Sequence, residues 1–489
     1  MYRASTSFLP PVALNFDDGM PLYRQLSDWF RRAIRDGSLK PGQRVPSSRD
    51  LAMELAVSRI SVMTAYEQLV AEGYLESFSG SRTCVAHTLP VDAVPQGSRS
   101  RSRAAADTTS RHASHRAGRI YAAEQPWSTG LGAFRFGLPA LDRFPLKTWS
   151  GLVSRHSRRA TEDLMAYGDV QGYLALRRAI AGYLGAFRSV RCDASQVLVT
   201  SGAQHGLFLV AQVLLDAGDE VWMEEPGNSG AHRALSFSKL TMIPVPVDRE
   251  GLDVAAGLRR APHARAAYVT PAHQFPTGAS MSPARRSQLL GWAARSGAWI
   301  IEDDYDSEYS FGDRPLPSLQ GADVDACVIH LGTFSKTMFP SIRLGYLVLP
   351  EELVPVFRRA RYSLDTCPPS LNQAAMADFI DAGHFARHIG RMRKLYQERR
   401  TALLEAIRDQ VGDRLELIGT PAGMQLTVLL PRGIDDVAVA KKASEKGVVA
   451  RPLSSCCLDP SDRGGLILGF GHIGPDAIRD GMRKIEACL

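Results

Sequence analysis

The segment GTFSKTMFPSIRLGY (residues 332–346) is the most informative stretch of this chain, because it carries the residue types that a covalently bound cofactor needs. Lys336 follows Ser335, and Arg343 stands seven positions later. A desolvated lysine can form a Schiff base with an aldehyde, and a guanidinium can bind the cofactor's phosphate in bidentate fashion. Thr333 and Ser335 add hydroxyls for the same phosphate. The segment therefore predicts a pyridoxal phosphate site with an internal aldimine at Lys336, the catalytic residue.

A second segment, VLVTSGAQHGLFLVAQVLL (residues 197–215), supplies a further part of a phosphate site. Its β-branched start predicts a buried strand, and the rest has the apolar spacing of a helix. A helix that begins directly after a strand offers free backbone N–H groups at the positive end of its dipole. Gly202, Ala203 and Gln204 are therefore expected to bind the cofactor. An ordinary turn between strand and helix is the alternative.

The strand expected in AWIIEDDY (residues 298–305) ends in acidic side chains, at the edge where an α/β sheet places its ligands. A carboxylate there can keep the nitrogen of a pyridine ring protonated. Asp303 is the first candidate for this role and Asp304 the second, while Tyr305 can donate a hydrogen bond to the phenolic oxygen of the ring. Solvated or salt-bridged acids at a strand end are the alternative.

The N-terminal region carries a second, independent signature. Apolar spacing predicts helices over residues 20–37, 46–57 and 58–75, and alternation over residues 74–86 predicts a hairpin that turns at Gly80. This order is the outline of a winged helix-turn-helix, which inserts one helix into the major groove of DNA. A protein-interaction module is the alternative. The residues expected at the DNA surface are Arg44, Ser47, Ser48, Arg49, Ser58, Arg59, Ser61 and Thr64.

In their order and spacing, these motifs resemble two known families joined in one chain. GQRVPSSRDLA, VSRISV and AEGYL resemble the GntR-type winged helix, and the cofactor segments resemble the fold-type I aminotransferases. Their fusion is the architecture of the MocR/GabR-type transcription regulators, and the resemblance covers nearly the whole chain. It implies pyridoxal 5'-phosphate as cofactor, double-stranded DNA with paired half-sites as partner, and a homodimer. The implied effector is a small amine, an amino acid or the cofactor itself.

The resemblance also assigns roles to three residues outside the motifs above. Gln274 lies in YVTPAHQFPTG (residues 268–278), which is similar to the family's loop beside the cofactor ring, and is expected to hydrogen-bond the cofactor. Tyr167 in AYGDVQGYLALRRAIAGYL is expected to reach across a dimer interface to the phosphate of the partner subunit. Arg451 in ARPLSS is expected to bind the carboxylate of an amino-acid effector, with a surface arginine as the alternative.

Several positions depart from the family pattern. Asn228 stands where relatives usually have an aromatic residue that stacks on the cofactor ring, and Gln425 replaces a common His. Val170 replaces a Pro after the expected interface tyrosine. In the DNA reader, Ile60 replaces an Asn of the recognition helix and Arg82 replaces a Gly of the wing. The last two changes are expected to alter which DNA is read.

Resemblance and composition together predict three regions: a winged helix over residues 16–87, a flexible basic linker over residues 88–126, and an aminotransferase-like body over residues 127–489. The linker region is rich in Ser, Ala and Arg, a composition that cannot bury enough apolar surface to order itself. It is a simple tether or an arm that adds contacts to DNA phosphates. The body is expected to be doubly wound α/β, with a small C-terminal α+β part from near Pro355.

Composition fits this organisation. The chain has 489 residues, 45% of them hydrophobic, and a net charge of +7, which is compatible with a nucleic-acid partner. Without a long apolar run or a signal core, a cytoplasmic location is expected. Seven cysteines without metal-like spacing fit reduced thiols, and no metal site is expected.

Two functions remain open at this stage. In the first, the body is a sensor in which an amine displaces Lys336 and the change repositions two DNA readers on paired half-sites. In the second, the body is an active aminotransferase in which Lys336 is also the general base, and the DNA-binding domain is accessory. The pocket residues are the same in both cases. The fused reader favours a regulator over an enzyme.

Overall fold

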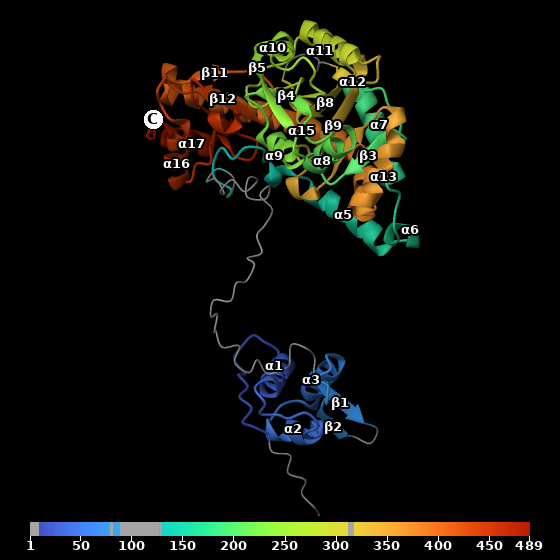
Figure 1. Ribbon diagram of the computed structural model, residues 1–489. Coiled ribbons are helices and arrows are strands. Elements are labelled where there is room, and N and C mark those ends of the chain that lie inside the picture. The colour runs from blue at the N-terminus through green and yellow to red at the C-terminus, as the bar shows by residue number, and fades with distance from the viewer. Residues whose placement is uncertain (1–8, 79–81, 89–126, 128–129, 312–316) are drawn as a thin grey trace, which may run out of the picture. The chain divides into compact units, whose positions relative to one another are not determined.

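The computed structural model describes residues 9–78, 82–88, 127, 130–311 and 317–489 (Figure 1). The chain divides into two compact units, Met1–His112 and Ala113–Leu489. The division falls inside the stretch 88–126 that is predicted to be a linker. Apart from Thr88, that stretch lies outside the described residues, as does the expected hairpin turn at Gly80.

The N-terminal unit is a small helical bundle with a two-stranded hairpin, as the sequence predicts. Its core is formed by buried side chains from all three helices, among them Phe30, Leu51, Val62 and Leu69. The hairpin strands pair in antiparallel register, with Leu75 opposite Val85. The elements are α1 (Leu22–Arg35), α2 (Ser48–Glu54), α3 (Arg59–Ala71), β1 (Leu75–Phe78) and β2 (Arg82–Val85).

Serine caps set the starts of the two helices of the turn. The hydroxyl of Ser47 accepts a hydrogen bond from the backbone N–H of Asp50 and begins α2, and that of Ser58 accepts one from Ser61 and begins α3. Each cap satisfies a donor that the first helical turn leaves without a partner. The helix-turn-helix is therefore fixed by local sequence.

The second unit is built on a mixed sheet of eight strands in the order β3-β10-β9-β8-β7-β4-β5-β6. The strands from β9 to β5 in this order are parallel to one another, whereas β10 runs antiparallel to both of its neighbours. The strands are β3 (Val197–Thr200), β4 (Glu220–Glu225), β5 (Thr241–Asp248), β6 (Gly251–Leu252), β7 (Ala266–Val269), β8 (Trp299–Asp304), β9 (Val328–Thr333) and β10 (Gly345–Val348).

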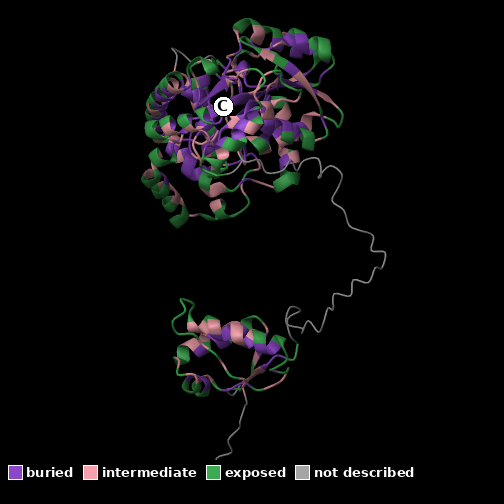
Figure 2. Cartoon of the chain, turned by 90° about the vertical axis from the view of Figure 1, so that its left-hand side faces the viewer, coloured by how far each residue is buried: buried purple, intermediate pink, exposed green. Residues whose placement is uncertain are grey.

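Helices cover both faces of this sheet (Figure 1). Successive strand residues alternate between two buried clusters: Met223 packs with α8, α9 and α13, whereas its neighbour Trp222 packs with α10 and α11 and stacks on Trp292. Figure 2 shows the buried residues gathered between the layers. The helices are α5 (Leu146–Arg158), α6 (Glu162–Met165), α7 (Leu174–Arg188), α8 (Ala203–Leu214), α9 (Ser229–Phe237), α10 (Val254–Arg260), α11 (Pro283–Ser296), α12 (Leu319–Ala322), α13 (Val354–Asp365), α14 (Ser370–Asp381) and α15 (His384–Gln410). The doubly wound body is confirmed.

A smaller C-terminal part contains a second, antiparallel sheet in the order β11-β12-β14-β13. The expected start near Pro355 is too early, because α13 packs on α8 and α14 packs on α5 and α7 of the large part. The long helix α15 then leads to the second sheet and packs against α17. The elements are β11 (Glu416–Ile418), β12 (Gln425–Leu429), α16 (Asp436–Glu445), β13 (Arg451–Pro452), β14 (Gly465–Gly469) and α17 (Pro475–Glu486).

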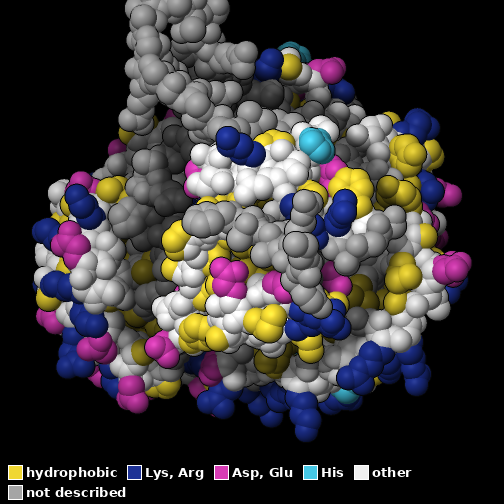
Figure 3. All heavy atoms as spheres, turned by 90° about the horizontal axis from the view of Figure 1, so that it is seen from below, with side chains coloured by type: hydrophobic (Ala, Val, Ile, Leu, Met, Phe, Trp, Pro, Cys, Tyr) yellow, Lys and Arg dark blue, Asp and Glu magenta, His cyan; other side chains and the backbone are white. Residues whose placement is uncertain are grey.

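Two further properties of the described residues bear on function. No helix among them is long and apolar enough to cross a membrane. On the face shown in Figure 3, acidic and basic side chains are mixed, with Lys and Arg gathered along the lower edge of the view. This surface is in keeping with the net charge of +7.

Candidate cofactor site and DNA-binding surface

Most of the predicted cofactor residues converge on one cavity of about 290 Å³. It lies where strands β8 and β9 end and helices α8 and α9 begin, the position at which α/β sheets bind ligands. The lining residues that the sequence predicts are Ala203, Gln204, Asp303, Tyr305, Thr333, Ser335, Lys336, Arg343 and Arg451. The lining residues without a predicted role in binding are Phe136, Asn228, Gly230, Arg233, Phe275 and Pro340.

Lys336 has the environment of a nucleophilic amine. Burial lowers the pKa of its ammonium group to about 8, against the opposing effect of the nearby carboxylates. Its Nζ donates a hydrogen bond to the carbonyl oxygen of Gly137 at 3.0 Å and lies 5.0 Å from the centre of the Phe136 ring. With this pKa about a tenth of the lysine is uncharged at pH 7, and the uncharged amine is the form that reacts with an aldehyde.

The end of the cavity at which the sequence predicts the cofactor's phosphate, called the phosphate end below, is formed by backbone and guanidinium groups. Gly202 is the N-cap of α8 with φ +97°, and a Cβ at this position would lie 2.9 Å from Nη2 of Arg343. The same Nη2 donates a hydrogen bond to the carbonyl oxygen of Ser201 at 2.6 Å. Gly202 does not line the cavity, but its missing side chain lets the guanidinium lie against the start of the helix. Thr333 and Ser335 complete this end of the lining.

The strand pleat assigns different roles to the two adjacent acids. Asp304 is buried in an ion pair with Arg188 at 2.7 Å. Burial opposes its ionisation, but the charges of Arg188 and His330 prevail and lower its pKa. Asp303 lines the cavity instead, and burial raises its pKa to about 6. Of the two candidates, Asp303 is the one placed to face a cofactor.

Asp303 is held by a chain of hydrogen bonds. Tyr268 donates its O–H to Oδ2 of Asp303 at 2.5 Å, and Nδ2 of Asn228 donates to the Tyr268 oxygen at 3.0 Å. Asn228 also caps α9 by accepting from the backbone N–H of Gly230. Asn228, which stands where relatives usually have an aromatic residue that stacks on the cofactor ring, thus positions Asp303 through Tyr268.

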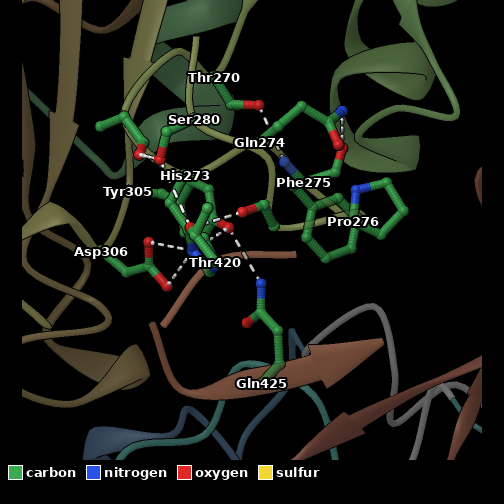
Figure 4. A network of polar contacts seen from close by, with 12 residues as sticks. Thr270, His273, Gln274, Phe275, Pro276, Ser280, Tyr305, Asp306, Thr420 and Gln425 are labelled. Atoms are coloured by element: carbon green, nitrogen blue, oxygen red, sulfur yellow. Dashed lines mark hydrogen bonds and ion pairs between the residues drawn. The ribbon is translucent and has the colours of Figure 1, made fainter. Parts of the chain in front are cut away.

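Tyr305 is oriented by a second network (Figure 4). Nε2 of Gln425 donates to the Tyr305 oxygen at 3.0 Å, and Nδ1 of His273 lies 3.1 Å from the same oxygen and 3.0 Å from Oδ1 of Asp306. A carboxylate only accepts hydrogen bonds, so Nδ1 of His273 carries the hydrogen and cannot accept one from Tyr305. The Tyr305 hydrogen therefore remains available for a group in the cavity.

Gln274 and Tyr167 are not brought to the cavity. Gln274 is buried in its loop, where its amide donates to the carbonyl oxygens of Pro226 and Phe275 and accepts from Thr277. These partners turn it away from the cavity, and the adjacent Phe275 lines the wall instead. Tyr167 is 88% exposed after α6, outside the cavity of its own chain.

Arg451 is placed at the cavity by the small sheet. Its Nε donates to Oγ of Ser455 at 3.1 Å, a second nitrogen donates to Oγ of Ser229, and the guanidinium lies 6.0 Å from the centre of the Phe275 ring. Arg233 on α9 lies at the same wall, a position that the sequence analysis missed. Its spacing of four residues from Ser229 on one helix face was the available signal.

The predicted DNA-contacting residues of the helix-turn-helix are all exposed or partly exposed. Arg44, Arg49 and Arg59 are exposed, while Ser47 and Ser58 are exposed but serve as helix caps. Ser48, Ser61 and Thr64 are partly exposed, and Nε of Arg59 donates to Oγ of Ser48 at 3.4 Å. Two apolar side chains not expected as contacts, Met53 and Met63, are exposed, and Ile60 is 76% exposed at the start of α3. Arg82 opens β2 on the wing and is exposed as well.

Comparisons with known proteins agree with this architecture. The family described as "Aminotransferase class I and II" matches residues 144–464, and "Bacterial regulatory proteins, gntR family" matches residues 22–85. "Probable rhizopine catabolism regulatory protein MocR" of Rhizobium meliloti is 41% identical, over 98% of this chain and 96% of its own length. The chain belongs to the MocR family of transcription regulators. Another regulator of similar architecture, the pyridoxine biosynthesis regulator PdxR of Corynebacterium glutamicum, is 32% identical over 97% of this chain and 98% of its own.

The body of this MocR-type regulator has the fold of solved aminotransferases. The α-aminoadipate aminotransferase LysN of Thermus thermophilus, in a complex with N-(5'-phosphopyridoxyl)-L-leucine, aligns with a TM-score of 0.70 and 29% identity over 76% of this chain and 96% of its own. The N-terminal unit is the DNA-binding part, because gntR-type regulators bind DNA. The MocR-type architecture thus accounts for both units.

The residues of the cavity fit pyridoxal phosphate. Oδ1 of Asp303 is buried without a hydrogen-bond partner among the described residues, as expected of an acceptor for a pyridine N–H. Gly202 leaves room for Arg343 beside the helix start, where a phosphate is stabilised by backbone N–H groups. Together with the family, this donor set assigns pyridoxal phosphate as the cofactor of the regulator.

Proposed function

We propose that the body senses a small amine, an amino acid or pyridoxal phosphate itself at Lys336, and that the winged helix converts this signal into altered DNA binding. The observation that carries the proposal is the complete cavity, with a buried lysine whose pKa is about 8, in one chain with a capped helix-turn-helix. The regulator would bind two half-sites as a homodimer.

When bound, pyridoxal phosphate supplies an aldehyde for which Lys336 and an incoming amine compete, and a ring that withdraws electrons. Arg343 binds the phosphate, and Asp303 holds a proton on the ring nitrogen. Tyr305 directs its hydrogen toward the ring oxygen, because Gln425 and His273 occupy its other hydrogen-bonding directions. The Lys336 ammonium group releases its proton more readily than an exposed lysine because burial lowers its pKa.

Arg451 is the proposed anchor for the carboxylate of an amino-acid effector. It lines the cavity from the small sheet, whereas Lys336 lies on the large part, so one ligand would contact both parts of the body. A ligand that contacts both parts can bind one arrangement of the large and small parts more tightly than another. This difference in affinity is what a ligand needs in order to shift the body between two conformations. Arg451→Ala is expected to weaken effector binding at least tenfold and to leave cofactor binding unchanged.

Tyr167 is the proposed contribution of one subunit to the phosphate of the other. Its exposure in the single chain, beside exposed Met165, supports a role at an interface. Mixed dimers of a Tyr167→Phe chain and a Lys336→Ala chain provide the test. Only one site of such a dimer can react with cofactor, and its phosphate would face an intact Tyr167. Cofactor affinity per reactive site should therefore exceed that of the Tyr167→Phe homodimer.

The visible absorption spectrum tests the proposal as a whole. A cofactor band that is lost in Lys336→Ala, and that shifts stably with one class of amine while operator affinity changes, would support the sensor. Full conversion to the pyridoxamine form, reversed by a 2-oxo acid, would support the second candidate, an active aminotransferase. The uncharged fraction of Lys336 favours that candidate, because such an amine can also act as a general base.

A further inference from the structure

Two guanidinium groups meet at one hydroxyl on the wall of the cofactor cavity. Nη1 of Arg233 lies 3.4 Å from Oγ of Ser229, and Nη2 of Arg451 donates a hydrogen bond to the same oxygen. The two arginines come from α9 and β13, more than two hundred residues apart, and both line the cavity. The Ser229 hydroxyl accepts hydrogen bonds from both guanidinium groups but carries no negative charge that could balance theirs.

Neither guanidinium is neutralised by the part of the chain that the structure describes. Among the described residues, arginines such as Arg177, Arg188 and Arg285 form ion pairs with carboxylates. Arg233 and Arg451 form no ion pair with any described residue. Burial and the charge of Arg451 lower the pKa of Arg233. Burial and both guanidiniums also lower the pKa of His232 to about 4. Two like charges held this close favour the binding of an anion.

The other charges of the cavity already have counterparts in the bound cofactor. Arg343 faces the phosphate, and Asp303 faces the ring nitrogen. Lys336 loses its charge when it reacts as an amine. The pair formed by Arg233 and Arg451 therefore leaves two positive charges for the ligand to balance.

An apolar wall separates the arginine pair from the reactive lysine. Nζ of Lys336 lies 5.0 Å from the centre of the Phe136 ring, and the rings of Phe136 and Phe275 are 4.7 Å apart. The guanidinium of Arg451 lies 6.0 Å from the centre of the Phe275 ring. A ligand that reaches both ends passes two aromatic rings, which suits a short hydrocarbon spacer.

We propose that the effector is a primary amine whose acidic end carries two negative charges, bound jointly by Arg233 and Arg451 in place of the Ser229 hydroxyl. The assignment rests on the proposed function, because the amine must reach Lys336. A phosphonate and a pair of carboxylates share this chemistry. A monoanionic or uncharged end leaves part of the positive charge unbalanced, so it binds more weakly.

A matched series of ligands tests the charge of the acidic end. The full-length protein, loaded with cofactor, is titrated at pH 8 with 2-aminoethylphosphonate and 2-aminoethylsulfonate, with (2-aminoethyl)malonate and 4-aminobutyrate, and with ethylamine. The absorption spectrum reports the reaction, and calorimetry reports affinity. The phosphonate and the sulfonate share their length and tetrahedral shape and differ in charge. The phosphonate should bind at least tenfold more tightly than the sulfonate, and (2-aminoethyl)malonate at least tenfold more tightly than 4-aminobutyrate, its monocarboxylate of equal length.

Variants separate the arginine pair from general charge effects. Arg233→Gln should reduce the preference for the dianion to less than twofold, and Arg451→Gln should weaken all acidic ligands. Arg432→Gln removes an exposed arginine outside the cavity and should change neither property. Each variant should retain the cofactor band and the melting temperature of the parent protein, which excludes misfolding as the cause.

The outcomes distinguish this inference from the function on which it rests. Equal affinities for the phosphonate and the sulfonate and for (2-aminoethyl)malonate and 4-aminobutyrate, or an unchanged preference in Arg233→Gln, would overturn the dianion assignment while the sensor stands. Tight binding of ethylamine would do the same. If no amine changes either the spectrum or the heat of binding, the proposal that the body senses an amine or amino acid fails, and the effector assignment fails with it.

Discussion

Replacing Gly202 by Ala is expected to weaken cofactor binding beyond its effect on stability. Gly202 has φ +97°, a conformation that costs a residue with a Cβ about 1–3 kcal/mol. The new Cβ would also lie 2.9 Å from Nη2 of Arg343, closer than real Cβ contacts permit. The guanidinium must therefore move away from the phosphate end of the cavity.

The size of the effect follows from the bond that is lost. A hydrogen bond to a charged group contributes roughly 1.5–3 kcal/mol, and 1.4 kcal/mol corresponds to about a tenfold change in an equilibrium constant. Gly202→Ala should therefore raise the dissociation constant of pyridoxal phosphate by about 10- to 100-fold. Absorption titration of the apoprotein measures this constant, and thermal unfolding without cofactor measures the loss of stability.

Gly218 provides a matched control. Its φ is +98°, and a Cβ at that position would meet no atom within 4 Å. Gly218→Ala should therefore show a similar loss of thermal stability, because the backbone strain is the same, with an unchanged dissociation constant for the cofactor. If the Gly202 variant binds pyridoxal phosphate as tightly as the Gly218 variant, the contact with Arg343 does not position the phosphate anchor and the reasoning is wrong.

Four other changes follow from the same structure. Burial raises the pKa of Asp303 from its usual value near 4 to about 6, so the stability linked to its protonation is present below pH 4 and is lost as pH rises to about 6. Asp303→Asn should therefore stabilise the apoprotein relative to the parent by on the order of 2–3 kcal/mol at pH 7 but not at pH 4, as measured by denaturant unfolding. Arg188→Met leaves the Asp304 carboxylate buried without its ion pair and should lower the free energy of unfolding by about 3–5 kcal/mol in the same assay. A loss below about 1 kcal/mol would contradict the importance of that ion pair. Ser58→Ala removes the cap of α3, so it should lower the free energy of unfolding by about 1 kcal/mol and weaken operator binding. The control Ser48→Ala removes no cap and should leave the melting temperature within about one degree of the parent protein's. Because the pKa of Lys336 is about 8, the rate at which the apoprotein captures pyridoxal phosphate should rise with pH around a midpoint near 8, and a rate that is flat from pH 6 to 9 would refute the assigned environment of this lysine.

Much of the cofactor site could be predicted because its residues stand at the ends of regular elements. A buried strand followed by small residues and a helix places Ala203 and Gln204 at a helix start, wherever that helix packs. The segment around Lys336 likewise begins where β9 ends and leads, through residues 334–344, to the adjacent strand β10. Such local geometry depends on neighbouring residues, so the sequence pattern alone indicates it.

Residues whose roles depend on long-range packing were not predictable in the same way. Gln274 follows a strand as the family pattern requires, yet its side-chain amide donates hydrogen bonds to the carbonyl oxygens of Pro226 and Phe275 instead of facing the cavity. Arg233 gave no signal beyond its helical spacing, because its significance arises only when β13 brings Arg451 to the same hydroxyl. The start of the small part was also misjudged, since only packing shows that α13 and α14 belong with the large sheet.

The amino-acid pattern was sufficient to predict the two-part organisation, the capped helix-turn-helix, the doubly wound body, and the lysine, the pair of adjacent acids and the arginine of the cofactor site. These features follow from periodicity, caps and strand ends, which act over a few residues. Tertiary structure alone decided which of two adjacent acids faces the cavity, how Asn228 supports Asp303 through Tyr268, and which arginines converge beside the cofactor. A strand fixes only that neighbouring side chains point to opposite faces, and the packing of the rest of the chain decides which face becomes the site.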